Sequence, residues 1–141
     1  MTRRKAFQLI GAIAICQSAG ILGSFVAPPS WVLSPVWLIL YTCMGIAAWL
    51  VWQKKTKEEC HCAALQLFLF QLALNTIWTF LFFGLREPLL ALIEIVILLL
   101  VVSVVIWQFW KISKPASYLL VPYALWVAFA AYLNLAIWLS N

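Results

Sequence analysis

Five long apolar stretches dominate the chain, and short polar turns separate them. An α-helix of about 20 apolar residues spans the hydrocarbon core of a bilayer, and each stretch has about this length. The predicted spans are residues 6–26, 35–53, 62–83, 89–110 and 118–140. Short turns make successive helices run antiparallel in a compact bundle. The pattern therefore predicts an all-α fold, in which residues 1–141 form a single integral membrane domain of five transmembrane helices.

The lysines and arginines fall almost entirely in alternate gaps between these stretches. Eight of the nine basic residues lie before the first stretch, between the second and third, or between the fourth and fifth; only Arg86 lies in another gap. Basic residues concentrate on the cytoplasmic side of multi-pass proteins. We therefore expect the N-terminus inside and the C-terminus outside. The expected location is the inner (plasma) membrane of a cell, or an organelle membrane in a eukaryote.

Composition narrows the class further. With 67% hydrophobic and only 9% charged residues, a soluble domain of this size could not cover its apolar surface. The formal net charge of +5 does not indicate nucleic-acid binding, because the basic residues are divided among turns that flank the membrane. We expect contacts with membrane lipid instead.

Few residues in the sequence suggest catalysis or metal binding. The chain has one histidine and no aspartate, and the spacing of Cys60, His61 and Cys62 is too tight for the usual zinc pattern. No nucleophile, base and acid occur at a common depth. We predict a protein that is not an enzyme and holds no metal. A transporter remains an alternative, although the predicted spans carry a single carboxyl group and no inverted repeat.

Polar side chains gather in the outer half of the predicted bundle. At 1.5 Å per residue, Glu94, Trp78 and Asn134 fall about one and a half turns below the outer face, and Asn75 about one turn deeper. Such groups are costly when they face lipid, so they should point inward. They either form hydrogen bonds between helices or surround a ligand pocket that opens to the outside.

Glu94 is the most informative of these residues. A carboxyl group inside the membrane is by default a candidate for function. The alternative is a packing role, in which a protonated Glu94 bonds to Asn75, Gln71 or the indole of Trp78.

The nine tryptophans fit only partly with the aromatic belts of a membrane protein. Most lie near the predicted ends of the spans. Trp78 and Trp126 lie farther in, and Trp37 lies at the outer end of its span, beside them. A belt accounts for these three least well, which favours a pocket with aromatic walls.

Three segments resemble the TspO/MBR family of translocator and tryptophan-rich sensory proteins. They are residues 28–45 (PPSWVLSPVWLILYTCMG), residues 71–78 (QLALNTIW) and residues 122–138 (PYALWVAFAAYLNLAIW). The resemblance implies a five-helix bundle, often a homodimer, that needs no obligatory cofactor. It also implies a pocket for tetrapyrroles such as protoporphyrin IX or haem, and for similar flat hydrophobic ligands.

Matching positions assign the pocket residues. The resemblance implies that Trp37, Asn75 and Trp126 line the pocket, and its implied neighbours are Trp78, Tyr123, Phe129 and Ala130. A sensory or binding role is the first hypothesis. Transport of tetrapyrroles or other lipophiles is the second, and light- or oxygen-dependent porphyrin breakdown is the third.

The chain departs from the family pattern in two places. A Trp-Tyr-x-x-Leu-x-Lys-Pro segment, which covers the pocket in the family, is missing before Pro28. No basic residue follows Tyr132, so the cholesterol motif of the mammalian proteins is not expected here.

Overall fold

The computed structural model describes residues 2–24, 35–54 and 58–140. These residues form long helices, with no strand among them, which confirms the all-α prediction. The helices are α1 (Arg3–Ser24), α3 (Pro35–Gln53), α4 (Glu58–Thr79), α5 (Pro88–Ile112) and α6 (Lys114–Ser140), and a π-helical turn η1 (Phe80–Gly84) continues α4. The predicted outer turn at 27–34, with Trp31, lies outside the described residues, as do Lys55 and Lys57.

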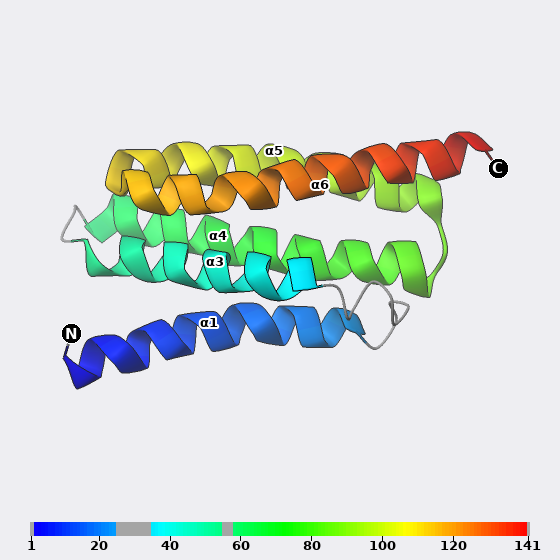
Figure 1. The fold of residues 1–141 in the computed structure, drawn as a ribbon. Coiled ribbons are helices and arrows are strands. Elements are labelled where there is room, and N and C mark those ends of the chain that lie inside the picture. The colour runs from blue at the N-terminus through cyan, green and yellow to red at the C-terminus, as the bar shows by residue number, and fades with distance from the viewer. Residues whose placement is uncertain (1, 25–34, 55–57, 141) are drawn as a thin grey trace.

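The helices lie side by side along one axis (Figure 1). Helix α1 packs along α3 on one side of the bundle, and α5 packs along α6 on the other. Helix α4 contacts α5, and α3 contacts α6, so that the two sides join. The N-terminus and the C-terminus lie at opposite ends of the bundle (Figure 1).

Four of the described helices contain a segment long and apolar enough to cross a membrane. These segments are Val36–Gln53, Cys62–Gly84, Pro88–Ile112 and Lys114–Ser140. The chain is therefore a multi-pass membrane protein. Helix α1, the first predicted span, is not among the four. The count of five spans and the orientation of the termini remain predictions.

Two predicted helix boundaries differ from the structure. The sequence predicts a turn over residues 111–117, but α5 continues to Ile112 and α6 already begins at Lys114. Pro115 falls in the first turn of α6, where a missing backbone N–H costs nothing because that group has no partner within the helix. Helix α4 likewise begins at Glu58, inside the predicted turn at 54–61.

Helices α1 and α3 approach closely at Gly45. A Cβ atom at this position would lie 2.6 Å from the Cα of Ile13, so only glycine fits without a shift of backbone. Polar contacts join the same pair of helices. The Nε2 of Gln17 donates to the Oγ1 of Thr42 at 3.2 Å, and the Nε2 of Gln53 donates to the Oε1 of Gln8 at 2.6 Å. Small residues and amides thus hold α1 against α3, as is usual between membrane helices.

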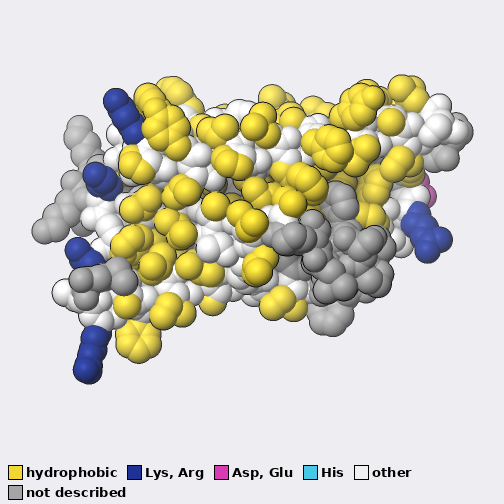
Figure 2. All heavy atoms as spheres, in the orientation of Figure 1, with side chains coloured by type: hydrophobic (Ala, Val, Ile, Leu, Met, Phe, Trp, Pro, Cys, Tyr) yellow, Lys and Arg dark blue, Asp and Glu magenta, His cyan; other side chains and the backbone are white. Residues whose placement is uncertain are grey.

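Basic side chains gather at the end of the bundle where α1 begins, and fewer lie at the opposite end (Figure 2). At the crowded end, the ammonium of Lys111 lies 3.5 Å from the ring centroid of Trp107, and that of Lys114 lies 5.1 Å from the centroid of Trp110. Cations above indole faces are characteristic of residues at a membrane–water boundary. The long middle of the bundle presents mainly hydrophobic side chains (Figure 2).

Candidate ligand-binding site

An aromatic and amide cluster joins α3, α4 and α6 in the half of the bundle away from the basic end. Trp37 stacks on Tyr41 one turn along α3, with ring centroids 5.5 Å apart. The edge of Trp37 meets Trp126 of α6 at 5.9 Å and 86°. The phenolic oxygen of Tyr41 accepts a hydrogen bond of 2.9 Å from the Nδ2 of Asn75 on α4. The three residues that were predicted to line a pocket are thus linked, through Tyr41, across three helices.

Tyr41 was missing from the sequence prediction. It lies four residues after Trp37, so the two side chains share a helix face, and this spacing was the available signal. Its hydroxyl group is buried together with the amide of Asn75, whose side chain is only 2% exposed. Tyr41 is therefore the residue that connects the predicted tryptophan wall with the predicted amide.

A second polar contact joins three helices nearer the end of the bundle opposite the basic end. The indole Nε1 of Trp78 on α4 donates to the Oδ1 of Asn134 on α6 at 3.1 Å. The Nδ2 of Asn134 in turn donates to the backbone oxygen of Pro88, at the start of α5, at 2.8 Å. Phe82 of the π-helical turn stacks on Trp78 at 5.1 Å. Trp78 and Asn134 thus form hydrogen bonds between helices, which is the simpler of the two arrangements predicted for the polar side chains.

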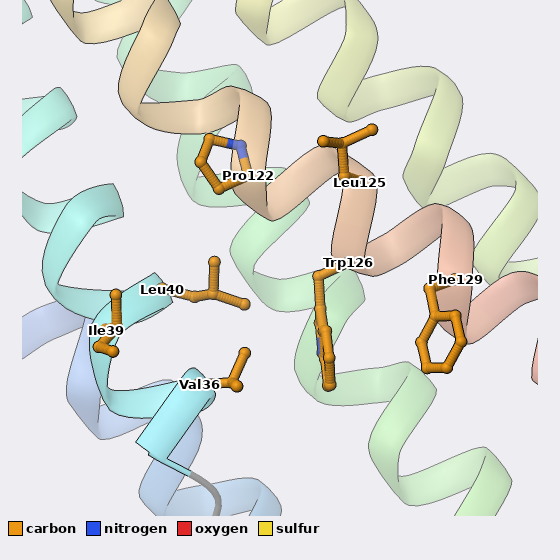
Figure 3. Close-up of a pocket in the computed structure, with 7 residues that line it drawn as sticks. All are labelled: Val36, Ile39, Leu40, Pro122, Leu125, Trp126 and Phe129. Carbon is orange, nitrogen blue, oxygen red and sulfur yellow. The ribbon is translucent and has the colours of Figure 1, made fainter.

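A groove lies between α3 and α6, beside the aromatic cluster (Figure 3). Its volume is about 570 Å³, and its lining residues are Val36, Ile39, Leu40, Pro122, Leu125, Trp126 and Phe129. In Figure 3, Trp126 extends from α6 into the space that faces α3. The groove is apolar and opens at the side of the bundle, so a lipophilic molecule could reach it from the bilayer.

The structure divides the predicted pocket residues into two sets. Trp126 and Phe129 lie on the groove wall. The others are buried and not part of that wall; they are Trp37, Asn75, Trp78, Tyr123 and Ala130. Trp126 belongs to both environments, because it lines the groove and also touches the buried Trp37.

Glu94 and Gln71 are buried, on α5 and α4. Among the described residues, neither the carboxyl oxygens of Glu94 nor the amide of Gln71 has a hydrogen-bond partner. The partners considered for Glu94 in a packing role do not bond to it: Asn75 bonds to Tyr41, and Trp78 bonds to Asn134. Buried polar groups without partners are costly, so their presence here needs a reason.

The two unpartnered groups lie at similar depth. Trp78 and Pro88 both bond to Asn134, so they mark one level of the bundle. Gln71 lies seven residues before Trp78 on α4, and Glu94 lies six residues after Pro88 on α5. At 1.5 Å per residue, Gln71 and Glu94 both lie roughly 10 Å deeper than that contact. The buried hydroxyl of Tyr123 also has no hydrogen-bond partner among the described residues. Polar groups without partners thus lie deeper in the bundle than the contact of Trp78 with Asn134.

Membrane-length helices packed around a buried aromatic and amide cluster define a multi-pass membrane protein. Comparison with known proteins agrees with this class. The model of the TspO/MBR family matches residues 12–139, and the chain belongs to that family.

Relatives occur in bacteria, archaea and animals. The chain is 44% identical over 110 residues to the tryptophan-rich protein TspO of Chlorobaculum tepidum, a match that covers 78% of this chain and 70% of the relative. It is 40% identical to the tryptophan-rich protein TspO of Archaeoglobus fulgidus, over 87% of this chain and 78% of the relative. It is 38% identical to the translocator protein of Ovis aries, over 81% of this chain and 68% of the relative. These relatives are named as translocator or tryptophan-rich proteins and not as enzymes.

Proposed function

We propose that this TspO/MBR protein binds a porphyrin, haem or a similar flat hydrophobic molecule between α3 and α6, in a sensory or binding role. The contact of Trp37 with Trp126 carries the proposal, because it connects the wall of an apolar groove, where Trp126 lies, to the buried aromatic cluster behind it. Flat π systems stack on indoles, and such stacking adds to the energy of burying apolar area.

The path of the ligand follows from this geometry. A lipophile enters the groove from the bilayer and contacts Trp126 and Phe129 first. A turn of the Trp126 ring away from Trp37 then opens the way to Tyr41, which stacks on Trp37, and to Asn75, which bonds to Tyr41. Asn75 bonds a polar edge of the ligand, and the indoles cover its faces.

Titration of the purified protein with protoporphyrin IX tests the proposal. The wild type should bind it with quenching of tryptophan fluorescence, and the double variant Trp126→Ala, Asn75→Ala should lose this binding. Trp107→Ala is the matched control, because Trp107 is 58% exposed and lies beside Lys111 near the end of α5. Equal affinity in the wild type and the double variant would refute the assignment of the site.

Transport is the second candidate, and one observation favours it. The unpartnered polar groups of Glu94, Gln71 and Tyr123 lie between the Trp78–Asn134 contact and the basic end. A transport path through the bundle would need polar groups at these depths. The animal relatives are named translocator proteins. Proteoliposomes that carry protoporphyrin IX across the membrane, at a rate that falls in Glu94→Gln, would support transport. Binding without flux would favour the sensory role.

The arrangement in the membrane forms part of the same proposal. We infer that α1 is a fifth span, because it lies along α3 and bonds to it through Gln8 and Gln17. The basic residues at the end where α1 begins support an N-terminus inside and a C-terminus outside, in the inner membrane of a cell. A homodimer is proposed from the family resemblance alone, and crosslinking in native membranes tests it.

A further inference from the structure

A second groove lies in the other half of the bundle, between α1, α3 and α4. Its volume is about 340 Å³, and its walls include Gly11, Ile15, Trp49, Trp52 and Phe68. Gly11 lies eight residues from the start of α1, and Trp49 lies four residues from the end of α3, so the groove is near the basic end. It shares no lining residue with the α3–α6 groove.

The absence of a side chain at Gly11 creates part of this space. A Cβ placed there would meet no heavy atom within 4 Å, in contrast to Gly45, where it would meet the backbone of Ile13. Gly45 is therefore needed for close helix packing, whereas Gly11 leaves the groove open. Ile15 and Trp52 are 54% and 55% exposed, so the groove opens toward lipid.

Polar and charged groups lie at the end of the groove nearest the membrane surface. Gln8 is part of the wall and bonds to Gln53. Arg4 precedes Gln8 by one helical turn, so the two share a face of α1, and Lys54 directly follows Gln53. Both cationic residues are exposed. The groove thus combines an apolar length with positive charge at its membrane-surface end.

One further group suggests an oxygen-bearing occupant. The indole Nε1 of Trp49 is buried and donates no hydrogen bond within the described residues. A buried donor without an acceptor is costly. The ester oxygens of a phospholipid lie between its charged headgroup and its acyl chains, as Trp49 lies between Lys54 and the groove interior.

We propose that this groove binds one acyl chain of an anionic phospholipid, whose headgroup contacts Arg4 and Lys54. The exposed apolar walls select a lipid chain, and the cations select a negative headgroup. The site is separate from the proposed porphyrin site, and its test does not depend on that proposal.

Native mass spectrometry of the detergent-solubilised protein tests the proposal, with phosphatidylglycerol and phosphatidylcholine of identical chains. The wild type should retain one phosphatidylglycerol and prefer it over phosphatidylcholine by roughly fivefold for each cation engaged. Gly11→Leu should fill the groove and abolish retention. Ala14→Leu is the control, since Ala14 is exposed on the same helix and does not line the groove.

A second variant and its control test the proposed contact between the cations and the lipid headgroup. Arg4→Gln should reduce the preference for phosphatidylglycerol roughly fivefold, and Arg86→Gln, in the turn between α4 and α5, should leave it unchanged. If Gly11→Leu does not fold, Ala12→Leu fills the same groove from the next position on α1. Wild-type retention in the folded filling variant, or equal retention of both lipids by the wild type, would overturn the proposal.

Discussion

Trp78 and Asn134, 56 residues apart in the chain, form a buried hydrogen bond of 3.1 Å between α4 and α6. Asn134 also donates to the backbone oxygen of Pro88, so a single amide joins three helices at one end of the bundle. Apolar attraction between helices is weak in lipid, and polar contacts of this kind therefore contribute a larger share of the specificity of packing.

Loss of this amide should destabilise the bundle. Asn134→Ala removes the acceptor of the Trp78 indole and the donor to Pro88, and we expect a loss of about 1–2 kcal/mol in unfolding free energy. Unfolding in mixed detergent micelles, followed by circular dichroism, measures the change. Ser140→Ala is the control, because Ser140 is exposed and, among the described residues, its hydroxyl bonds only within α6. If both variants unfold alike, the three-helix contact has no role in stability.

The close approach of α1 and α3 predicts opposite effects at two glycines. Gly45→Ala places a methyl group 2.6 Å from the Cα of Ile13, and overpacking of this kind costs about 1–3 kcal/mol. Gly11→Ala adds the same group in open space and should leave the thermal unfolding temperature unchanged or slightly raised. The ranking of the two melting temperatures in one detergent is the measurement. A Gly45→Ala protein as stable as Gly11→Ala contradicts the observed packing.

Variants of Asn75 and Tyr41, which bond to each other, test which of the two residues binds the ligand. Asn75→Leu removes the amide that is proposed to bond the ligand, and porphyrin affinity should fall about tenfold, as expected for one lost hydrogen bond in a buried site. Tyr41→Phe removes only the phenolic oxygen and keeps the stack on Trp37, so affinity should stay within about threefold. Isothermal titration of both variants decides the matter. A larger loss in Tyr41→Phe than in Asn75→Leu would make Tyr41 the ligand-binding group.

The proposed orientation predicts which side of the membrane holds each terminus. A reporter that folds only outside the cytoplasm should be active when fused after residue 140 and inactive when fused before residue 3. Native Cys62, exposed in the second turn of α4, should react with a membrane-impermeant thiol reagent only in inside-out vesicles. Labelling of Cys62 from the outside of intact cells would reverse the topology.

Much of the fold could be predicted because bilayer thickness fixes helix length. Counting residues from the outer ends placed Trp78 and Asn134 at one depth, and they do bond to each other. The same count placed Glu94 at that depth, but Asn134 bonds to Pro88, six residues before Glu94, so Glu94 lies deeper than predicted. The start of α6 was predicted wrongly, because Pro115 was interpreted as a turn although proline is tolerated in the first turn of a helix.

The lateral arrangement of side chains was harder to predict. Helices that are apolar on all sides carry little information about which face points inward, so Tyr41 was not recognised as the partner of Asn75. The positions of the two grooves also depend on which face of each helix points inward. The pocket residues Trp37, Asn75 and Trp126 came from family resemblance, and the structure brings them together through Tyr41.

Single-tryptophan proteins give the most direct test of the proposed binding site. In one variant only Trp126 remains, and in the other only Trp107; phenylalanine replaces the remaining tryptophans in both. Protoporphyrin IX at a stoichiometric amount should quench the Trp126 protein strongly and the Trp107 protein far less, because Trp126 lines the groove between α3 and α6, whereas Trp107 lies beside Lys111 near the end of α5 and does not line it. Equal quenching of both, or stronger quenching of Trp107, would contradict a ligand site between α3 and α6.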